Sequence, residues 1–328
     1  MIRLFLLAGE PSGDKLGAAL MAGLTKVAGK GAVGFLGVGG DLMQAQGMRS
    51  LFEMSELSVM GYAEVIPKYP ALKRRMEQTV AEVLRQKPDA LITIDSPDFC
   101  LRVARRVRAV SDLRTIHYVA PSVWAWRPGR AAKMARYIDH VLALLPFEPP
   151  LMQAAGMTCD FVGHPVAGEP PASQSERRAF ANIYGTADKL TILVLPGSRR
   201  SEVARLAPVF GKALEVVLAR HPDAKIVVPV TANVAHDVLQ ACTFWPGTPI
   251  VLDPRALPAA EAETRKRIAF DAADVALAAS GTVSLELAAS NTPMVIGYDM
   301  SWLSWQIMSR LSRVDTVTLV NIIDQSRG

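Results

Sequence analysis

Short apolar runs alternate with helix-length segments along nearly the whole chain. The runs are four to six residues long and rich in Val, Ile, Leu and Ala, which is typical of strands buried on both faces of a parallel sheet. Their alternation with helices predicts right-handed βαβ units. In the first half we expect strands at 3–8, 33–38, 90–95, 114–119 and 139–144, with helices near 14–28, 70–87, 99–110 and 129–137.

A second series of the same kind follows a stretch where Pro, Gly and Ser cluster, at 162–165 and 169–173. Such a cluster is typical of a linker. The sequence therefore predicts the α/β class, with two doubly wound Rossmann-like domains at 1–166 and 167–328. In the second domain we expect strands near 190–195, 225–230, 249–252, 274–278 and 293–297, and helices near 201–220, 258–270 and 282–290.

The strand predicted at 90–95 stops abruptly at Asp95, which Ser96, Pro97 and Asp98 follow. In open α/β sheets the ligand crevice lies beyond the carboxyl ends of the strands, so this carboxylate is placed to act on a substrate. Apolar neighbours would raise its pKa and make it a better proton acceptor at neutral pH. Asp is also a favoured helix cap, and this stretch alone leaves both interpretations open.

The first turn, Ala8–Asp14, directly follows the first strand. Its small residues let a ligand approach the backbone, and the helix behind it offers free N–H groups and a positive dipole end. An anionic or hydroxylated ligand would suit it, although an ordinary helix start capped by Ser12 or Asp14 also explains these residues. Gly37–Gly40 lacks the spacing of a dinucleotide fingerprint, and we interpret it as a turn.

Two segments of the first half combine apolar or aromatic residues with charged ones. The segment 57–76 places an apolar set, which includes Val65, Ile66, Tyr69 and Leu72, close to four Lys and Arg residues. This suits acyl chains lying below phosphate headgroups, and core packing beside a wet helix face explains it nearly as well.

The other segment, 116–127, contains His117 and two of the five tryptophans, just past a strand. Aromatic faces pack well on sugar rings, so the cluster favours a site. His117 taken alone would more often be a buried structural histidine.

In the second domain, two strands each lead into a small-residue turn and a helix. The first turn carries Gly197, Ser198 and Arg199, and backbone donors with a guanidinium suit a diphosphate. The second carries Ser280, Gly281 and Thr282, followed by Glu286, whose carboxylate can accept hydrogen bonds from both ribose hydroxyls. Helix N-termini favour Ser and Gly anyway, but two such turns together predict a nucleotide site.

Composition narrows the possible function classes. Hydrophobic residues make up 50% of the 328 residues, yet no apolar run approaches the roughly 18 residues of a spanning helix. The N-terminus enters a strand at once and lacks signal-peptide features, so we expect a cytoplasmic protein. The three cysteines have no Cys-x-x-Cys spacing, which suggests neither a disulfide framework nor a zinc site.

Charge is shared unevenly between the two halves. Residues 1–166 carry 20 Lys and Arg against 15 Asp and Glu, whereas 167–328 carry 16 of each, so the net charge of +5 belongs to the first half. A solvated face, anionic headgroups or a phosphorylated substrate would each account for the excess. Nucleic acid is not expected, because no basic segment is interleaved with exposed aromatics.

Taken together, the motifs resemble those of lipid-A-disaccharide synthases, glycosyltransferases of the GT-B type whose two Rossmann-like domains face a central cleft. The resemblance covers essentially the whole chain. It rests on the motifs at 8–14, 60–61, 94–99, 117–126, 145–148, 162–165, 195–199 and 279–282, with Glu286 and Asn321.

The resemblance implies transfer of 2,3-diacylglucosamine from its UDP donor to the 6-hydroxyl of 2,3-diacylglucosamine 1-phosphate, with inversion. It implies no metal and no other cofactor. It places the catalytic base at Asp95, which leaves Asp98 to cap the next helix. Acceptor contacts are then expected from Glu10, Ser12, Asp14, Val65, Ile66, Tyr69 and Leu72, and donor contacts from Gly197, Ser198, Arg199, Ser280, Gly281, Thr282, Glu286 and Asn321.

Further expectations concern location and assembly. The basic first domain would rest peripherally on the inner membrane, and a homodimer is possible. Family members continue for several tens of residues beyond the position matching Gly328, so the second domain is expected to be truncated. The alternatives are a UDP-sugar epimerase on the same fold, a binding protein without chemistry, and another sugar transferase with a lipid acceptor.

Overall fold

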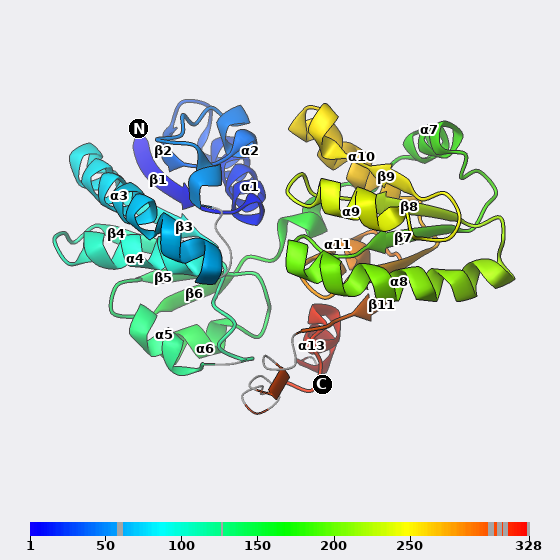
Figure 1. Ribbon diagram of the computed structural model, residues 1–328. Helices are drawn as coiled ribbons and strands as arrows, with labels where there is room; N and C mark the ends of the chain where they lie inside the picture. The colour runs from blue at the N-terminus through cyan, green and yellow to red at the C-terminus, as the bar shows by residue number, and fades with distance from the viewer. Residues whose placement is uncertain (58–61, 126, 301–304, 307–309, 311–313, 327–328) are drawn as a thin grey trace. The chain divides into compact units, whose positions relative to one another are not determined.

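The computed structural model describes residues 1–328 apart from 58–61, 126, 301–304, 307–309, 311–313 and 327–328, and apart from the side chains of 62–68. The chain divides into two compact units, Met1–Pro165 and Val166–Gly328. Each unit is built on one parallel sheet with helices around it (Figure 1).

The sheet of the first unit has six parallel strands in the order β2-β1-β3-β4-β5-β6. The chain leaves β1 toward β2 on one side and then crosses to β3 on the other, so the topological switch point lies between β1 and β3. The strands are β1 (Ile2–Ala8), β2 (Val33–Val38), β3 (Ala90–Ile94), β4 (Arg114–Tyr118), β5 (His140–Ala143) and β6 (Thr158–Phe161). The helices are α1 (Pro11–Ala28), α2 (Asp41–Ala45), α3 (Tyr62–Gln86), α4 (Pro97–Arg108), α5 (Gly129–Met134) and α6 (Pro149–Gln153).

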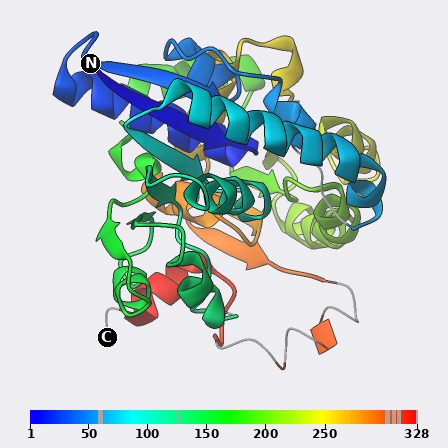
Figure 2. The ribbon, with the colours of Figure 1, turned by 90° about the vertical axis from the view of Figure 1, so that its left-hand side faces the viewer.

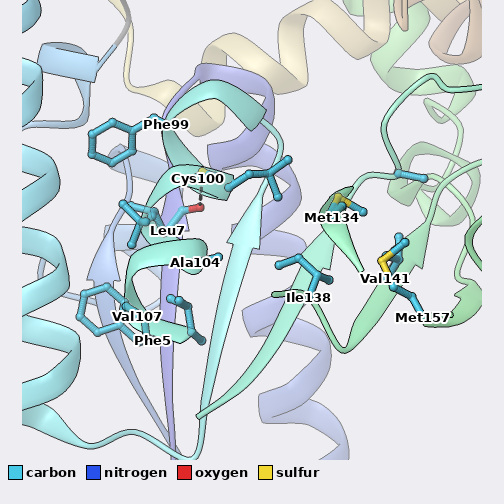
Figure 3. Packing of buried hydrophobic residues seen from close by; sticks show 14 of the residues in the cluster. Phe5, Leu7, Phe99, Cys100, Ala104, Val107, Met134, Ile138, Val141 and Met157 are labelled. Carbon is cyan, nitrogen blue, oxygen red and sulfur yellow. Dashed lines mark hydrogen bonds between the residues drawn. The ribbon is translucent and has the colours of Figure 1, made fainter. Parts of the chain in front are cut away.

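Helices cover both faces of this sheet, which is why β1 and β3 carry apolar residues on both faces rather than on alternate positions. On one face, Phe5 and Leu7 lie beside Cys100 and Val107 of α4, and the Cys100 thiol donates to the Leu7 carbonyl oxygen at 3.4 Å (Figure 3). The long helix α3 runs next to α4 (Figure 2). On the other face α1 packs so closely that a Cβ on Gly17 would lie 3.1 Å from a methyl group of Ile94.

The sheet of the second unit has five parallel strands in the order β11-β10-β7-β8-β9, which places its switch point between β7 and β10. Its strands are β7 (Thr191–Leu195), β8 (Lys225–Pro229), β9 (Ile250–Leu252), β10 (Val275–Ala279) and β11 (Met294–Gly297). Its helices are α7 (Gln174–Tyr184), α8 (Arg200–Arg220), α9 (Ala235–Cys242), α10 (Ala259–Asp271), α11 (Val283–Ala289) and α13 (Leu319–Ser326).

The predicted α/β class with two doubly wound Rossmann-like domains is confirmed. All ten predicted strands are present, each end within one residue of its expected place. The edge strand β6 was not predicted, because only Cys159 in it is buried and it has no apolar run. The helix predicted at 70–87 begins at Tyr62 and continues through Pro67 and Pro70, although a proline inside a helix removes a backbone hydrogen bond. No helix in the described part of the chain is long and apolar enough to cross a bilayer.

Candidate functional site

The first candidate site lies at the switch point of the first unit, where β1 and β3 end side by side. Ser12, in the first turn of α1, donates its hydroxyl hydrogen to Asp95 Oδ2 at 2.7 Å. The close approach of the turn after β1 to the turn after β3 depends on Gly9, since a Cβ there would lie 2.7 Å from Ser96 Oγ. The structure thus brings together two residues that the sequence singled out, Ser12 and Asp95. In open α/β folds ligands bind at such a point.

The backbone at Asp95 is strained. Asp95 and Ser96 have φ values of 51° and 41°, in the left-handed region that non-glycine residues rarely adopt. Each such residue costs on the order of 1–3 kcal/mol, and residues of this kind cluster at functional sites. The Asp95 amide is fixed by donating to the Tyr118 carbonyl oxygen at 3.0 Å. The Asp95 side chain is half-buried and directly follows the end of β3.

Asp98 does not occupy the cap position that the sequence suggested. Ser96 takes the N-cap position of α4, and Asp98 lies exposed inside the first turn. A carboxylate there still interacts favourably with the positive end of the helix dipole.

The other two acidic residues of the first turn differ from each other. Glu10 is half-buried at the N-cap position of α1. Asp14 is buried, and its carboxylate accepts hydrogen bonds from the backbone N–H groups of Gly40, Leu42 and Met43 at 2.8–3.0 Å. Burial raises the pKa of Asp14, and the backbone donors oppose that shift. This placement makes Asp14 the carboxylate that holds the start of α2.

The turn at Gly37–Gly40 is explained by the same contact. It leads from β2 into α2, and a Cβ on Gly40 would lie 2.5 Å from an Asp14 carboxylate oxygen. The sequence interpretation of a turn rather than a dinucleotide fingerprint agrees with this geometry.

His117 has a structural environment. It is 1% exposed in β4, and its Nδ1 lies 2.8 Å from Thr93 Oγ1 on β3. Burial lowers the pKa of His117 to about 3, with the Arg130 charge adding to the shift. The imidazole is therefore neutral at physiological pH. The expectation of a site around it is not supported at His117 itself, and Trp126 lies outside the described residues.

Sequence reasoning missed Glu148, which precedes α6 and is 3% exposed. Its carboxylate accepts from Trp124 Nε1 at 3.2 Å and from the Leu145 N–H at 3.0 Å. Burial raises the pKa of Glu148 to about 7, because these donors offset only part of the desolvation. The only signal in the sequence was the Leu145–Glu148 motif, which gave no hint that the side chain would be buried.

The segment expected to hold acyl chains is described in part. Tyr69 is half-exposed on α3, whereas Leu72 packs against the core of the first unit. The side chains of Val65 and Ile66 lie outside the described residues. Of the cations nearby, Arg75 forms a two-pronged ion pair with Glu56, with contacts of 2.5 and 2.8 Å.

The second candidate site lies at the switch point of the second unit, where β7 and β10 pair side by side. After β7, Gly197 adopts φ 126°, and Ser198 and Arg199 lead into the 21-residue helix α8. Glu202 folds back over this turn: it accepts from the Ser198 N–H at 3.2 Å and from Arg199 Nη1 at 2.8 Å. A carboxylate thus lies where the sequence predicted an anion cradle.

After β10, Ser280 donates its hydroxyl hydrogen to the Val317 carbonyl oxygen at 2.7 Å, which ties the turn to the segment before α13. Gly281 and Thr282 complete the turn into α11, and α11 contacts α13, which carries the exposed Asn321. Glu286, on the first turn of α11, forms a 2.6 Å ion pair with Lys266 of α10. The sequence did not predict Lys266, because nothing in α10 suggests which helix it faces.

Solved structures with a similar fold include complexes with UDP and with UDP-GlcNAc. A co-structure of S. aureus MnaA with UDP matches with a TM-score of 0.67 at 12% identity, covering 100% of this chain and 87% of that one. The UDP-GlcNAc 2-epimerase from Neisseria meningitidis bound to UDP-GlcNAc matches with a TM-score of 0.67 at 10% identity, covering 100% and 91%. At these identities the likeness shows the fold alone.

Relatives found by sequence have a much higher identity to this chain than these structures have. A lipid-A-disaccharide synthase from Ruegeria pomeroyi is 59% identical over 327 residues, covering 100% of this chain and 81% of the relative. One from Rhodospirillum centenum is 49% identical over 322 residues, covering 98% and 78%. The family model described as lipid-A-disaccharide synthetase matches residues 4–327. The chain therefore belongs to the lipid-A-disaccharide synthase family.

Proposed function

We propose that the protein transfers 2,3-diacylglucosamine from UDP-2,3-diacylglucosamine to the 6-hydroxyl of 2,3-diacylglucosamine 1-phosphate. The products are the β-1,6-linked disaccharide 1-phosphate and UDP, with inversion at the anomeric carbon. Family membership gives the coarse activity, a glycosyltransferase of lipid A biosynthesis. The observation that carries the finer proposal is Asp95, held on strained backbone at a switch point with a hydroxyl partner.

In this proposal Asp95 is the catalytic base and the first unit binds the acceptor. An inverting transfer is a single displacement, in which the acceptor oxygen attacks the anomeric carbon as the bond to UDP breaks. The hydroxyl proton passes to the Asp95 carboxylate, and the bonding electrons leave with the UDP phosphate oxygen. The hydroxyl of Ser12, 2.7 Å from Asp95 Oδ2, fixes the orientation of the base. Glu10, the N-cap residue of the same helix, contacts the acceptor sugar in this proposal.

The second unit binds the donor in this proposal. Arg199 and the backbone N–H groups at the start of α8 stabilise the departing diphosphate in the place of a metal ion. The diphosphate must displace Glu202, which now pairs with Arg199 at 2.8 Å. Ser280, Gly281 and Thr282 line the approach of the nucleotide, Glu286 binds the ribose, and Asn321 on α13 contacts the sugar. Among the described residues, no three His, Cys, Asp or Glu side chains gather as a metal site.

We also propose that the first unit rests on the cytoplasmic face of the inner membrane. The net charge of the chain comes from residues 1–166, and Tyr69 is half-exposed among the cations of α3. Anionic headgroups attract such a surface, and acyl chains of the acceptor would lie along α3.

The decisive experiment incubates the purified protein with the UDP-diacylglucosamine donor and the diacylglucosamine 1-phosphate acceptor. Mass spectrometry should then find the disaccharide 1-phosphate, and a coupled assay should find one UDP per disaccharide. UDP formation without disaccharide, or an epimerised sugar, would instead support the epimerase alternative that the fold allows. Full retention of donor and acceptor at all enzyme concentrations would contradict the proposal.

A further inference from the structure

We infer that Lys266 is a positioning residue for the donor site, which holds the Glu286 carboxylate in the orientation that selects a ribose over a 2′-deoxyribose. The inference rests on the proposed role of Glu286 in binding the ribose. Lys266 Nζ lies 2.6 Å from Glu286 Oε2, and the two side chains are only 28% and 15% exposed. An ion pair so shielded from water holds its geometry better than a pair on the surface.

The two helices that carry this pair pack into the core of the second unit. Lys266 Nζ lies 5.3 Å from the centre of the Phe270 ring, one turn along α10, and Phe270 is 2% exposed. Glu286 lies next to Leu287, which is fully buried in the same hydrophobic cluster as Phe270. The ion pair therefore joins two helices that cannot easily shift, and the direction of the carboxylate follows from theirs.

The other cations of α10 serve different partners. Arg265 contacts the Tyr184 hydroxyl oxygen and Glu261, and Arg267 contacts Glu176 and the Pro170 carbonyl oxygen. These contacts brace α10 against α7 and the chain before it. Lys266 is thus the cation of α10 that turns toward α11 and the turn after β10.

The chemistry explains why a lysine would be useful there. A carboxylate has about four lone-pair positions, so Glu286 can accept from an ammonium group and from two vicinal hydroxyls at once. Without the ammonium group, the Glu286 carboxylate would lose a charged partner 2.6 Å away that helps to fix its rotamer. A ligand with both ribose hydroxyls would then lose the most affinity, because it donates two hydrogen bonds to this carboxylate.

The test measures the affinity of the full chain for UDP and for 2′-deoxy-UDP by calorimetry. We expect the wild type to prefer UDP by about tenfold, as expected for a hydrogen bond to a charged group. Lys266→Met, which keeps the length of the stem, should weaken UDP binding by about tenfold and reduce the preference to about twofold. Lys266→Arg should restore most of the preference, and Arg265→Ala, on the same helix, should leave both affinities unchanged.

The outcomes separate this inference from the proposed function. If Glu286→Gln leaves the preference for UDP unchanged, the ribose role of Glu286 is wrong, and the inference falls with it. If Glu286→Gln removes the preference but Lys266→Met does not, only the positioning role of Lys266 is wrong. Equal weakening of UDP and 2′-deoxy-UDP in Lys266→Met also overturns it, since a general disturbance of the fold would do that. Should Lys266→Met fail to fold, Lys266→Gln provides the same comparison.

Discussion

The carboxylates at the strand ends differ between the two units. In the first unit, Asp95, Asp14 and Glu148 accept hydrogen bonds from a hydroxyl, from backbone N–H groups and from an indole. In the second unit, Glu202 and Glu286 pair with Arg199 and Lys266. The two units share a doubly wound topology, but these acids are surrounded by neutral hydrogen-bond donors in the first unit and by cations in the second. A proton acceptor needs the first arrangement, whereas a site for an anionic diphosphate needs the second.

The sharpest test of this difference is Asp95. Asp95→Ala should lower kcat by about a thousandfold, because general-base catalysis contributes roughly 10²–10⁴-fold. The affinity for UDP should stay within about twofold, since the proposed donor residues belong to the second unit. Rates are measured by disaccharide formation, and UDP affinity by calorimetry.

Asp98→Ala is the matched control, three residues away and exposed. We expect it to keep most of the activity, because Asp98 only adds charge to the first turn of α4. If Asp98→Ala abolished turnover while Asp95→Ala did not, the base would be the other carboxylate.

The next largest effect is the pH dependence that Glu148 gives to the free energy of unfolding. Its folded-state pKa of about 7 lies above the ordinary value of 4.5, so the unfolded chain releases this proton first. Protonated Glu148 therefore stabilises the fold, and this contribution is fully present below about pH 4.5 and is lost as the pH rises through about 7. Its contribution to the free energy of unfolding is at most about 3 kcal/mol.

Glu148→Gln should remove that pH dependence. Urea unfolding between these two pH values, followed by tryptophan fluorescence, should show a smaller fall in unfolding free energy for the variant than for the wild type. Glu169→Gln, a carboxyl in the second unit, serves as the control. An identical pH profile for wild type and Glu148→Gln would mean that folding does not raise the pKa of Glu148.

The sequence predicted the features that depend on neighbouring residues, and it missed those that depend on contacts between distant segments. The strands were predicted within one residue because most of them are short apolar runs, and Asp95 was singled out because it directly follows one of these runs. Long-range partners were not predicted: Asp14 bonds the backbone 26–29 residues away, and Lys266 meets Glu286 across two helices. Burial of Glu148 and His117 likewise depends on packing between distant segments, which no pattern of neighbouring residues specifies.

Arg199 tests the proposed role of the second unit, in which cations bind the diphosphate. Arg199→Ala should weaken UDP binding by roughly tenfold to a hundredfold, the worth of a charge-assisted hydrogen bond to phosphate. Arg200→Ala is the neighbouring control, because that side chain is highly exposed and reaches Asp237 of α9 instead. Equal loss of UDP affinity in Arg199→Ala and Asp95→Ala would contradict the division of labour between the units.

The smallest expected effect comes from Glu202, and it has the opposite sign. Glu202 now occupies the turn that is proposed to hold the diphosphate, with its carboxylate on Arg199 and on the Ser198 N–H. Glu202→Gln keeps a carbonyl oxygen for the Ser198 N–H but removes the competing charge, so UDP should bind about threefold more tightly, since exposed ion pairs are worth only about 0.2–1 kcal/mol. Calorimetry with UDP measures this, and the gain should shrink at high salt. Weaker binding in Glu202→Gln would mean that the carboxylate shapes the cradle rather than competes for it, and that the acids of the second unit hold their cations in place for the ligand.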